Sequence, residues 1–172
     1  MFYGCSGLTN IEIPNSVTTI ESFAFQNCKG LTSIKISNNV TTIGDWTFCG
    51  CLNLNSVTIP NNVTSIGEGV FSGCSNLTCI TIGNRVTSIG QNAFQNCTGL
   101  TSITLPNSVT VIGEKAFYGC RNLNKVTLPN SIITIKENAF RGCYCLTSIE
   151  IPNSVTSIGE CAFPYSTKVI RK

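Results

Sequence analysis

The chain has 172 residues, of which 42% are hydrophobic and only 11% are charged, and its net charge is +3. This composition argues against a disordered tail, and the scattered basic residues lack the electrostatic footprint of a nucleic-acid-binding protein. No apolar run reaches the ~20 residues that a membrane helix requires, and no basic-then-apolar secretory signal opens the chain. We therefore expect no nucleic-acid partner and no membrane insertion by this segment.

A constant step of 23 residues organises the whole chain. Leucine recurs at this step without an insertion, at Leu8, Leu31, Leu54, Leu77, Leu100, Leu123 and Leu146. Counting each of these leucines as position 0, positions 3 and 5 are Ile, Val or Leu, position 7 is Asn, position 12 is Ile and position 17 is Phe. A fixed period of this length predicts a repeat solenoid, in which each coil buries its apolar flank against the next.

Each coil is expected to contain three short segments in chain order. The alternation at positions 3 to 5, as in Ile103-Thr104-Leu105, predicts a half-buried strand. A second extended segment follows at positions 9 to 12, where β-branched residues dominate. The Gly-Glu-x-Ala-Phe segment after it predicts a short helical or 3₁₀ turn whose start favours negative charge.

These segments predict one parallel sheet that runs through the solenoid. Its strands are expected at residues 11–13, 34–36, 57–59, 80–82, 103–105, 126–128 and 149–151. A single solenoid over residues 1–172 would then comprise a partial coil, seven full coils and a terminal remnant, with the boundaries 1–7, 8–30, 31–53, 54–76, 77–99, 100–122, 123–145, 146–168 and 169–172.

The repeat unit L-x-x-I-x-I-P-N-S-V-T-x-I-G-E-x-A-F-x-G-C resembles the BspA-like leucine-rich repeat, also called the Treponema pallidum type. The resemblance covers essentially the whole chain and implies a curved, right-handed solenoid. It also implies a cell-surface or secreted protein of a bacterium or protozoan parasite that adheres to host or matrix proteins, and it carries over no catalytic residue. The chain departs from the pattern at Ser37 and Gly83, which replace proline, and at Pro164 and Ser166, which suggest a frayed or capping C-terminus.

The cysteines have two interpretations. Seven of the 11 form a column at position 20, namely Cys5, Cys28, Cys51, Cys74, Cys97, Cys120 and Cys143. Neighbours one coil apart could form a disulfide or metal ladder, but side chains in a column point the same way, which favours a buried, inert and unpaired column. The others are Cys49, Cys79, Cys145 and Cys161, and the chain has no His and no C-x-x-C pair. We therefore expect no metal site, no cofactor and no thiol nucleophile.

Two further features at fixed positions need an interpretation. The Asn side chains at position 7 are expected to satisfy backbone groups where the first strand turns. At position 15, Phe23 and Trp46 stand where other coils carry mostly polar or small residues. These two aromatic residues form either an exposed flank patch or a packing contact near the first coil.

The outward columns at positions 2 and 4 remain as the regular, uncommitted surface. The candidate ligand-binding residues on it are Ser33, Lys35, Ser56, Thr58, Thr81, Ser102, Thr104, Lys125 and Thr127. Paired carboxylates for glycoside hydrolysis are absent from this face, because Glu12 and Glu150 lie at opposite ends of it. We expect a non-catalytic binding or adhesion module for a protein ligand, with a structural spacer as the alternative and ice or crystal-surface binding as a minor one.

Overall fold

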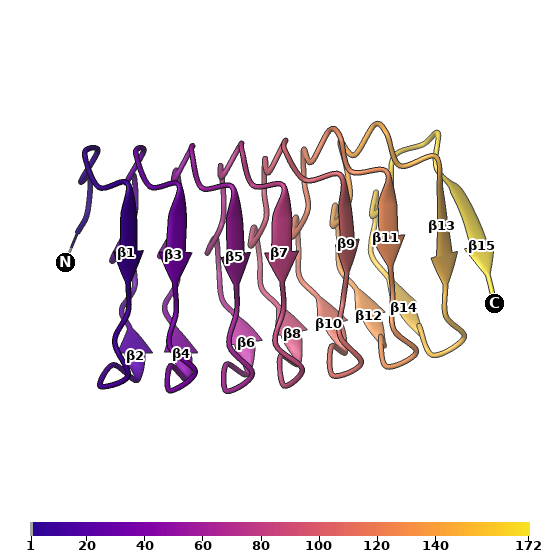
Figure 1. Ribbon diagram of the computed structural model, residues 1–172. Coiled ribbons are helices and arrows are strands. Elements are labelled where there is room, and N and C mark those ends of the chain that lie inside the picture. The colour runs from indigo at the N-terminus through magenta and orange to yellow at the C-terminus, as the bar shows by residue number, and fades with distance from the viewer. Residues whose placement is uncertain (1) are drawn as a thin grey trace.

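The computed structural model describes residues 2–172 as a stack of coils that follow one another in sequence order (Figure 1). Each coil opens with a strand of three or four residues on one side of the stack. These strands are β1 (Asn10–Glu12), β3 (Ser33–Lys35), β5 (Ser56–Thr58), β7 (Cys79–Thr81), β9 (Ser102–Thr104), β11 (Lys125–Thr127), β13 (Ser148–Ile151) and β15 (Lys168–Arg171). We call them the first strands.

A second set of two-residue strands lies farther along each coil, at the lower edge of the view in Figure 1. It comprises β2 (Thr19–Ile20), β4 (Thr42–Ile43), β6 (Ser65–Ile66), β8 (Ser88–Ile89), β10 (Val111–Ile112), β12 (Thr134–Ile135) and β14 (Ser157–Ile158). The Ile that ends each of these strands points into the core in every coil but the last, where Ile158 is 37% exposed. This set corresponds to the second extended segment that the sequence predicts.

All strand pairs are parallel, and nearly all have the predicted register of one repeat. Ile11 lies opposite Ile34 and Val57 lies opposite Ile80, so equivalent side chains stack directly on one another. The predicted parallel solenoid is therefore confirmed, although most of the first strands begin one residue earlier than expected.

The prediction of one continuous sheet is wrong. The first strands form three separate hydrogen-bonded sheets, β1-β3-β5-β7, β9-β11 and β13-β15, and the second strands form two. Even within the first of these sheets, β3 and β5 pair only through Ser33 and Ser56. Strands of three residues make few hydrogen bonds with each neighbour, so losing one or two of these bonds is enough to interrupt the ladder.

The predicted helical or 3₁₀ turn is also not found, and residues 2–172 contain no helix. In its place, the backbone N–H groups alternate between two kinds of acceptor. The N–H of Gln26 donates to the Phe23 carbonyl in its own coil (3.1 Å), whereas the N–H of Phe25 donates to the Thr47 carbonyl in the next coil (3.0 Å). A helix would use nearly all of these groups internally, so the chain gives up the helix for a third set of hydrogen bonds between coils.

This arrangement requires a left-handed backbone at position 15 of every coil. The residues there are Phe23, Trp46, Gly69, Asn92, Lys115, Asn138 and Cys161, with φ between 51° and 60°. Gly and Asn tolerate this conformation better than other residues. Glycine at position 13 has another cause, because a Cβ on Gly113 would lie 2.6 Å from the carbonyl carbon of Gly90 in the preceding coil.

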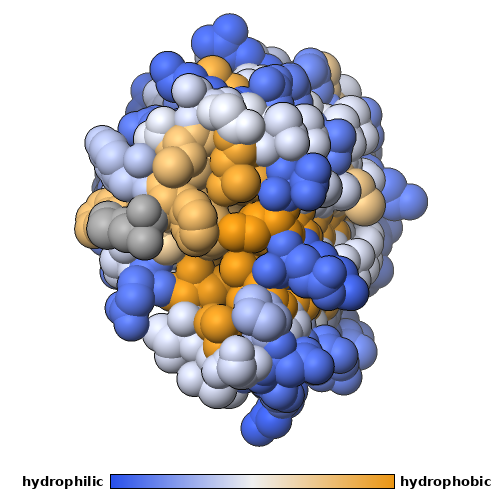
Figure 2. Space-filling model, turned by 60° about the vertical axis from the view of Figure 1, so that its left-hand side comes forward, coloured by the Kyte–Doolittle hydropathy of each residue, from blue (hydrophilic) through white to orange (hydrophobic). Residues whose placement is uncertain are grey.

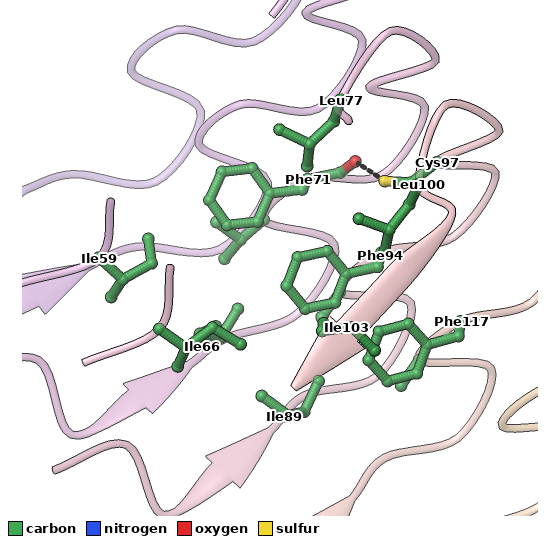
Figure 3. Packing of buried hydrophobic residues seen from close by; sticks show 14 of the residues in the cluster. Ile59, Ile66, Phe71, Leu77, Ile89, Phe94, Cys97, Leu100, Ile103 and Phe117 are labelled. Atoms are coloured by element: carbon green, nitrogen blue, oxygen red, sulfur yellow. Dashed lines mark hydrogen bonds between the residues drawn. The ribbon is translucent and has the colours of Figure 1, made fainter. Parts of the chain in front are cut away.

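Eight phenylalanine rings form a continuous ladder through the interior. Neighbouring ring centroids from Phe2 to Phe163 are 5.0 to 5.6 Å apart, and the ring planes are within 10° of parallel. Figure 3 shows Phe71, Phe94 and Phe117 of this ladder against the surrounding isoleucine and leucine side chains. The predicted Phe column is thus confirmed as core, and it binds each coil to both neighbours.

The two ends of the stack differ. At the first coil, Phe2 is 42% exposed and Leu8, Ile11 and Val17 are only partly buried, which produces the apolar surface in Figure 2. At the other end, β15 pairs with β13 at a step of 20 residues where the preceding pairs have 23. The last coil is therefore three residues shorter than expected, and the predicted remnant 169–172 instead contributes most of an eighth first strand.

Candidate functional site

The predicted binding face is exposed along its whole length. All nine candidate residues, from Ser33 to Thr127, have exposed side chains on the first strands, while the residue between each pair points inward. Their outward orientation is confirmed. Their role in binding remains a prediction.

The charges on this face are confined to its two ends. Lys35 pairs with Glu12 across adjacent coils (2.6 Å), and Lys172 pairs with Glu150 (2.5 Å). These side chains are more than half exposed, so each pair contributes little to stability. The central part, from β5 to β9, offers hydroxyl groups and one thiol.

Three hollows interrupt the face, and they coincide with the weak strand junctions. One of about 670 Å³ reaches from Glu12 to Thr58 over the frayed β3-β5 pair. The others, of about 410 and 310 Å³, lie between β7 and β9 and between β11 and β13, where the ladder is broken. At these two junctions the floor is apolar, because Ile80 and Val126 are only partly buried.

The cysteine column at position 20 belongs to the core. Cys28, Cys51, Cys74, Cys97, Cys120 and Cys143 are all buried, which confirms that part of the prediction, whereas Cys5 is exposed. Each buried thiol donates a hydrogen bond to a phenylalanine carbonyl of the preceding coil, as Cys97 does to Phe71 at 3.1 Å (Figure 3). Burial raises the pKa of Cys51 to about 12, so these thiols remain protonated and unreactive.

The four cysteines outside the column are scattered. Cys79, Cys145 and Cys161 are exposed, and Cys49 is half-buried. Residues 2–172 contain no group of three or more His, Cys, Asp or Glu side chains that could hold a metal ion. The same residues include no helix long and apolar enough to span a membrane.

The interpretation of the Asn column at position 7 is mostly wrong. The asparagines are exposed, and within the described chain only Asn15 and Asn61 make side-chain hydrogen bonds, to Ser37 and to the N–H of Asn84. The side chain at position 8 often bridges the coils instead. Asn62 Nδ2, for example, donates to the Asn38 carbonyl at 2.7 Å.

The two candidate flank residues, Phe23 and Trp46, have different environments. The Trp46 indole lies over Gly69 of the next coil, in the space that a Cβ at that position would occupy. Phe23 is 41% exposed. Trp46 is thus largely a packing residue, and only Phe23 presents a substantial apolar surface.

The structure also reveals a polar and aromatic groove that the sequence analysis did not single out. Two adjoining hollows of about 450 Å³ each lie over the turn segments of the last four coils and share Tyr118 and Arg141. We call them together the turn-side groove. It is lined by Asn92, Gln95, Lys115, Tyr118, Asn138, Arg141, Gly142, Tyr144, Cys161, Phe163, Pro164, Tyr165 and Ser166. The available signal was that three of the chain's four tyrosines fall within residues 118–165, at positions that are small or polar in most other coils.

Comparisons with solved structures find extensive similarity. The chain is 35% identical to a leucine-rich repeat protein from Bacteroides ovatus, with a TM-score of 0.88 over 95% of this chain and 45% of that one. It is 26% identical to the leucine-rich repeat protein of T. pallidum, with a TM-score of 0.80 over 91% of this chain and 78% of that one. A leucine-rich cell surface protein from Faecalibacterium prausnitzii is 30% identical, with a TM-score of 0.58 over 95% of this chain and 60% of that one.

The chain thus spans less than half the length of the Bacteroides protein. A search of curated proteins gave no match. The family model described as BspA type leucine-rich repeat region matches residues 1–121 and 87–171, in six copies. Together with the parallel coils and the phenylalanine ladder, this match shows that the chain belongs to the BspA-type leucine-rich repeat family, which is generally a family of non-enzymatic repeat scaffolds.

Proposed function

We propose that this chain is a non-catalytic adhesion module of a cell-surface or secreted protein, and that it presents the first-strand face to a host or matrix protein. The observation that carries the proposal is the face itself. Its outward side chains are exposed on successive strands and make few contacts within the chain. The cell-surface relative from Faecalibacterium supports the location.

The chemistry of the face favours weak contacts repeated over several coils. Hydroxyl groups form modest hydrogen bonds, and the hollows at the strand junctions accept small apolar side chains of a partner. Affinity then grows with the area of the contact and with the number of coils engaged. The irregular hollows count against ice or crystal binding, which requires a flat and regular array.

The test is a triple substitution at the centre of the face. Thr58→Glu, Thr81→Glu and Thr104→Glu together should weaken binding to immobilised fibronectin and other matrix glycoproteins at least tenfold in surface plasmon resonance. All three side chains are exposed, so the melting temperature should change little. The matched control is Thr19→Glu, Thr42→Glu and Ser65→Glu, which places the same charges on exposed positions of the second strands.

A structural spacer is the second candidate, and the continuous phenylalanine ladder favours it because the ladder ties neighbouring coils into one stack. A spacer would show no binding to any matrix protein. Equal affinity of the folded triple variant and the control would refute the first-strand face as the binding surface.

A further inference from the structure

The turn-side groove has a built polar floor. Lys115 Nζ contacts Glu114 Oε1 at 2.8 Å, Asn138 Nδ2 donates to Glu137 Oε1 at 2.7 Å, and Arg141 Nη1 donates to Asn138 Oδ1 at 3.2 Å. Asn138 is 6% exposed, so these contacts fix its amide in place. The floor is therefore held by hydrogen bonds before any ligand arrives.

The balance of charge argues for a ligand rich in hydroxyl groups. Two cations, Lys115 and Arg141, stand beside two carboxylates, Glu114 and Glu137, which leaves the groove close to neutral. A polyanion would meet both carboxylates. Sugar hydroxyls both donate and accept hydrogen bonds, and they match the mixed amide, guanidinium and phenol groups.

One acceptor in the groove lacks a partner in the described chain. Asn92 lines the first hollow, and its Oδ1 is buried without a hydrogen bond. Buried polar atoms are nearly always paired, and an unpaired one requires an explanation. A hydroxyl group of a ligand seated over Asn92, with a small rotation of the amide, supplies the missing donor.

The second hollow supplies aromatic surfaces. Tyr144 is 70% exposed and Tyr165 is 100% exposed, while Tyr118 and Phe163 are half-buried beside them. Pro164 and Tyr165 lie in the part of the last coil that is three residues short, so the shortened coil shapes this end of the groove. Flat aromatic faces with a polar rim can pack against the C–H face of a pyranose ring, and Tyr and Arg are the residues enriched in binding hot spots.

We propose that the turn-side groove is a carbohydrate-binding site. In this site Tyr144 and Tyr165 pack against sugar rings, the amides of Asn92, Gln95 and Asn138 bind hydroxyl groups, and Arg141 faces a hydroxyl or a single carboxylate. Each hollow, at about 450 Å³, is within the range of small-ligand sites. The site lies on the turn segments, away from the first-strand face, and does not depend on that face's function.

Four soluble probes test the proposal on the full chain: lactose, cellobiose, N,N′-diacetylchitobiose and 3′-sialyllactose. Binding is measured by saturation-transfer difference NMR and by isothermal titration calorimetry. At least one probe should bind. Tyr144→Ala and Arg141→Ala should each weaken that binding tenfold or more. Tyr165→Ala should also weaken it, and this fully exposed residue can be removed without loss of core packing.

The matched controls are Tyr3→Ala and Arg85→Ala, which remove an exposed tyrosine and an exposed arginine outside the groove. Their affinity should stay within twofold of the native chain, and so should that of the Thr58, Thr81 and Thr104 triple variant. The proposal is overturned if no probe binds, or if the groove variants and the controls lose affinity alike. Binding of a hexaglutamate peptide that requires Arg141, without binding of any sugar, would also overturn it and indicate an acidic protein segment as the ligand.

Discussion

At the scale of single residues, the thiols of position 20 show how a repeat uses a weakly polar group in its core. A cysteine fits beside the phenylalanine ladder as a small hydrophobe, and its thiol satisfies a carbonyl of the preceding coil. Desolvation by burial raises the pKa of Cys28, Cys51, Cys74, Cys97 and Cys120 above 9.0. Their protonated form is therefore part of the folded state.

This shift predicts a loss of stability in alkali. Between pH 9 and about 12, Cys51 loses its proton in the unfolded chain but keeps it in the fold, so the free energy of unfolding falls as the pH rises. Each such thiol contributes a slope of up to about 1.4 kcal/mol per pH unit. Urea unfolding from pH 8 to 10.5 measures the slope. Cys51→Ala should make it shallower, and a free energy of unfolding that stays constant above pH 9 would contradict the prediction.

At the scale of elements, each coil is a unit that contacts its neighbours through three sets of hydrogen bonds and a column of stacked side chains. The first strands, the second strands and the turn segments each bond to the adjacent coil, as at Ser56 with Cys79, Ser65 with Ser88 and Gly69 with Gln91. No single set runs unbroken, but where the first strands separate at β7 and β9, the second strands and the turn segments continue across the junction. The coil is therefore the natural unit of insertion and deletion.

Deletion of residues 77–99 tests this modularity. The remaining coils keep their register, because Asn76 and Leu100 occupy consecutive positions of the repeat. The chain should fold with a free energy of unfolding lower by about 1–2 kcal/mol, roughly one seventh of the 5–15 kcal/mol typical of a domain. Circular dichroism and urea unfolding measure the change. Deletion of residues 77–88 serves as the control and should abolish cooperative unfolding, because it puts the flanking coils out of register.

At the scale of the whole molecule, stability should be graded along the stack. The inner coils have a neighbour on both sides, whereas the first coil leaves Phe2 and part of its core exposed, and all four residues of β15 are exposed at the other end. Local opening requires less free energy where fewer contacts must be broken.

Hydrogen exchange followed by mass spectrometry should therefore show a gradient. The amides of Phe71, Phe94 and Phe117, which donate to the following coil from inside the stack, should exchange slowest. The amides of residues 2–8 and 168–171 should exchange fastest. Uniform protection along the chain would instead indicate that all coils open in a single step.

The sequence alone determined the parallel stack, its register and its core, because a step of 23 residues places equivalent apolar side chains on top of one another and only stacking can bury them. It also located the exposed columns of the first strands, since alternation along a strand assigns each side chain to one face. Only the tertiary structure decided where the sheet breaks, because each junction depends on one or two hydrogen bonds between coils. The turn segments likewise resemble a helix start in isolation, and contact with the next coil diverts half of their N–H groups. The turn-side groove joins residues from coils 92–165 that share no motif, and only the stacking of coils places them side by side.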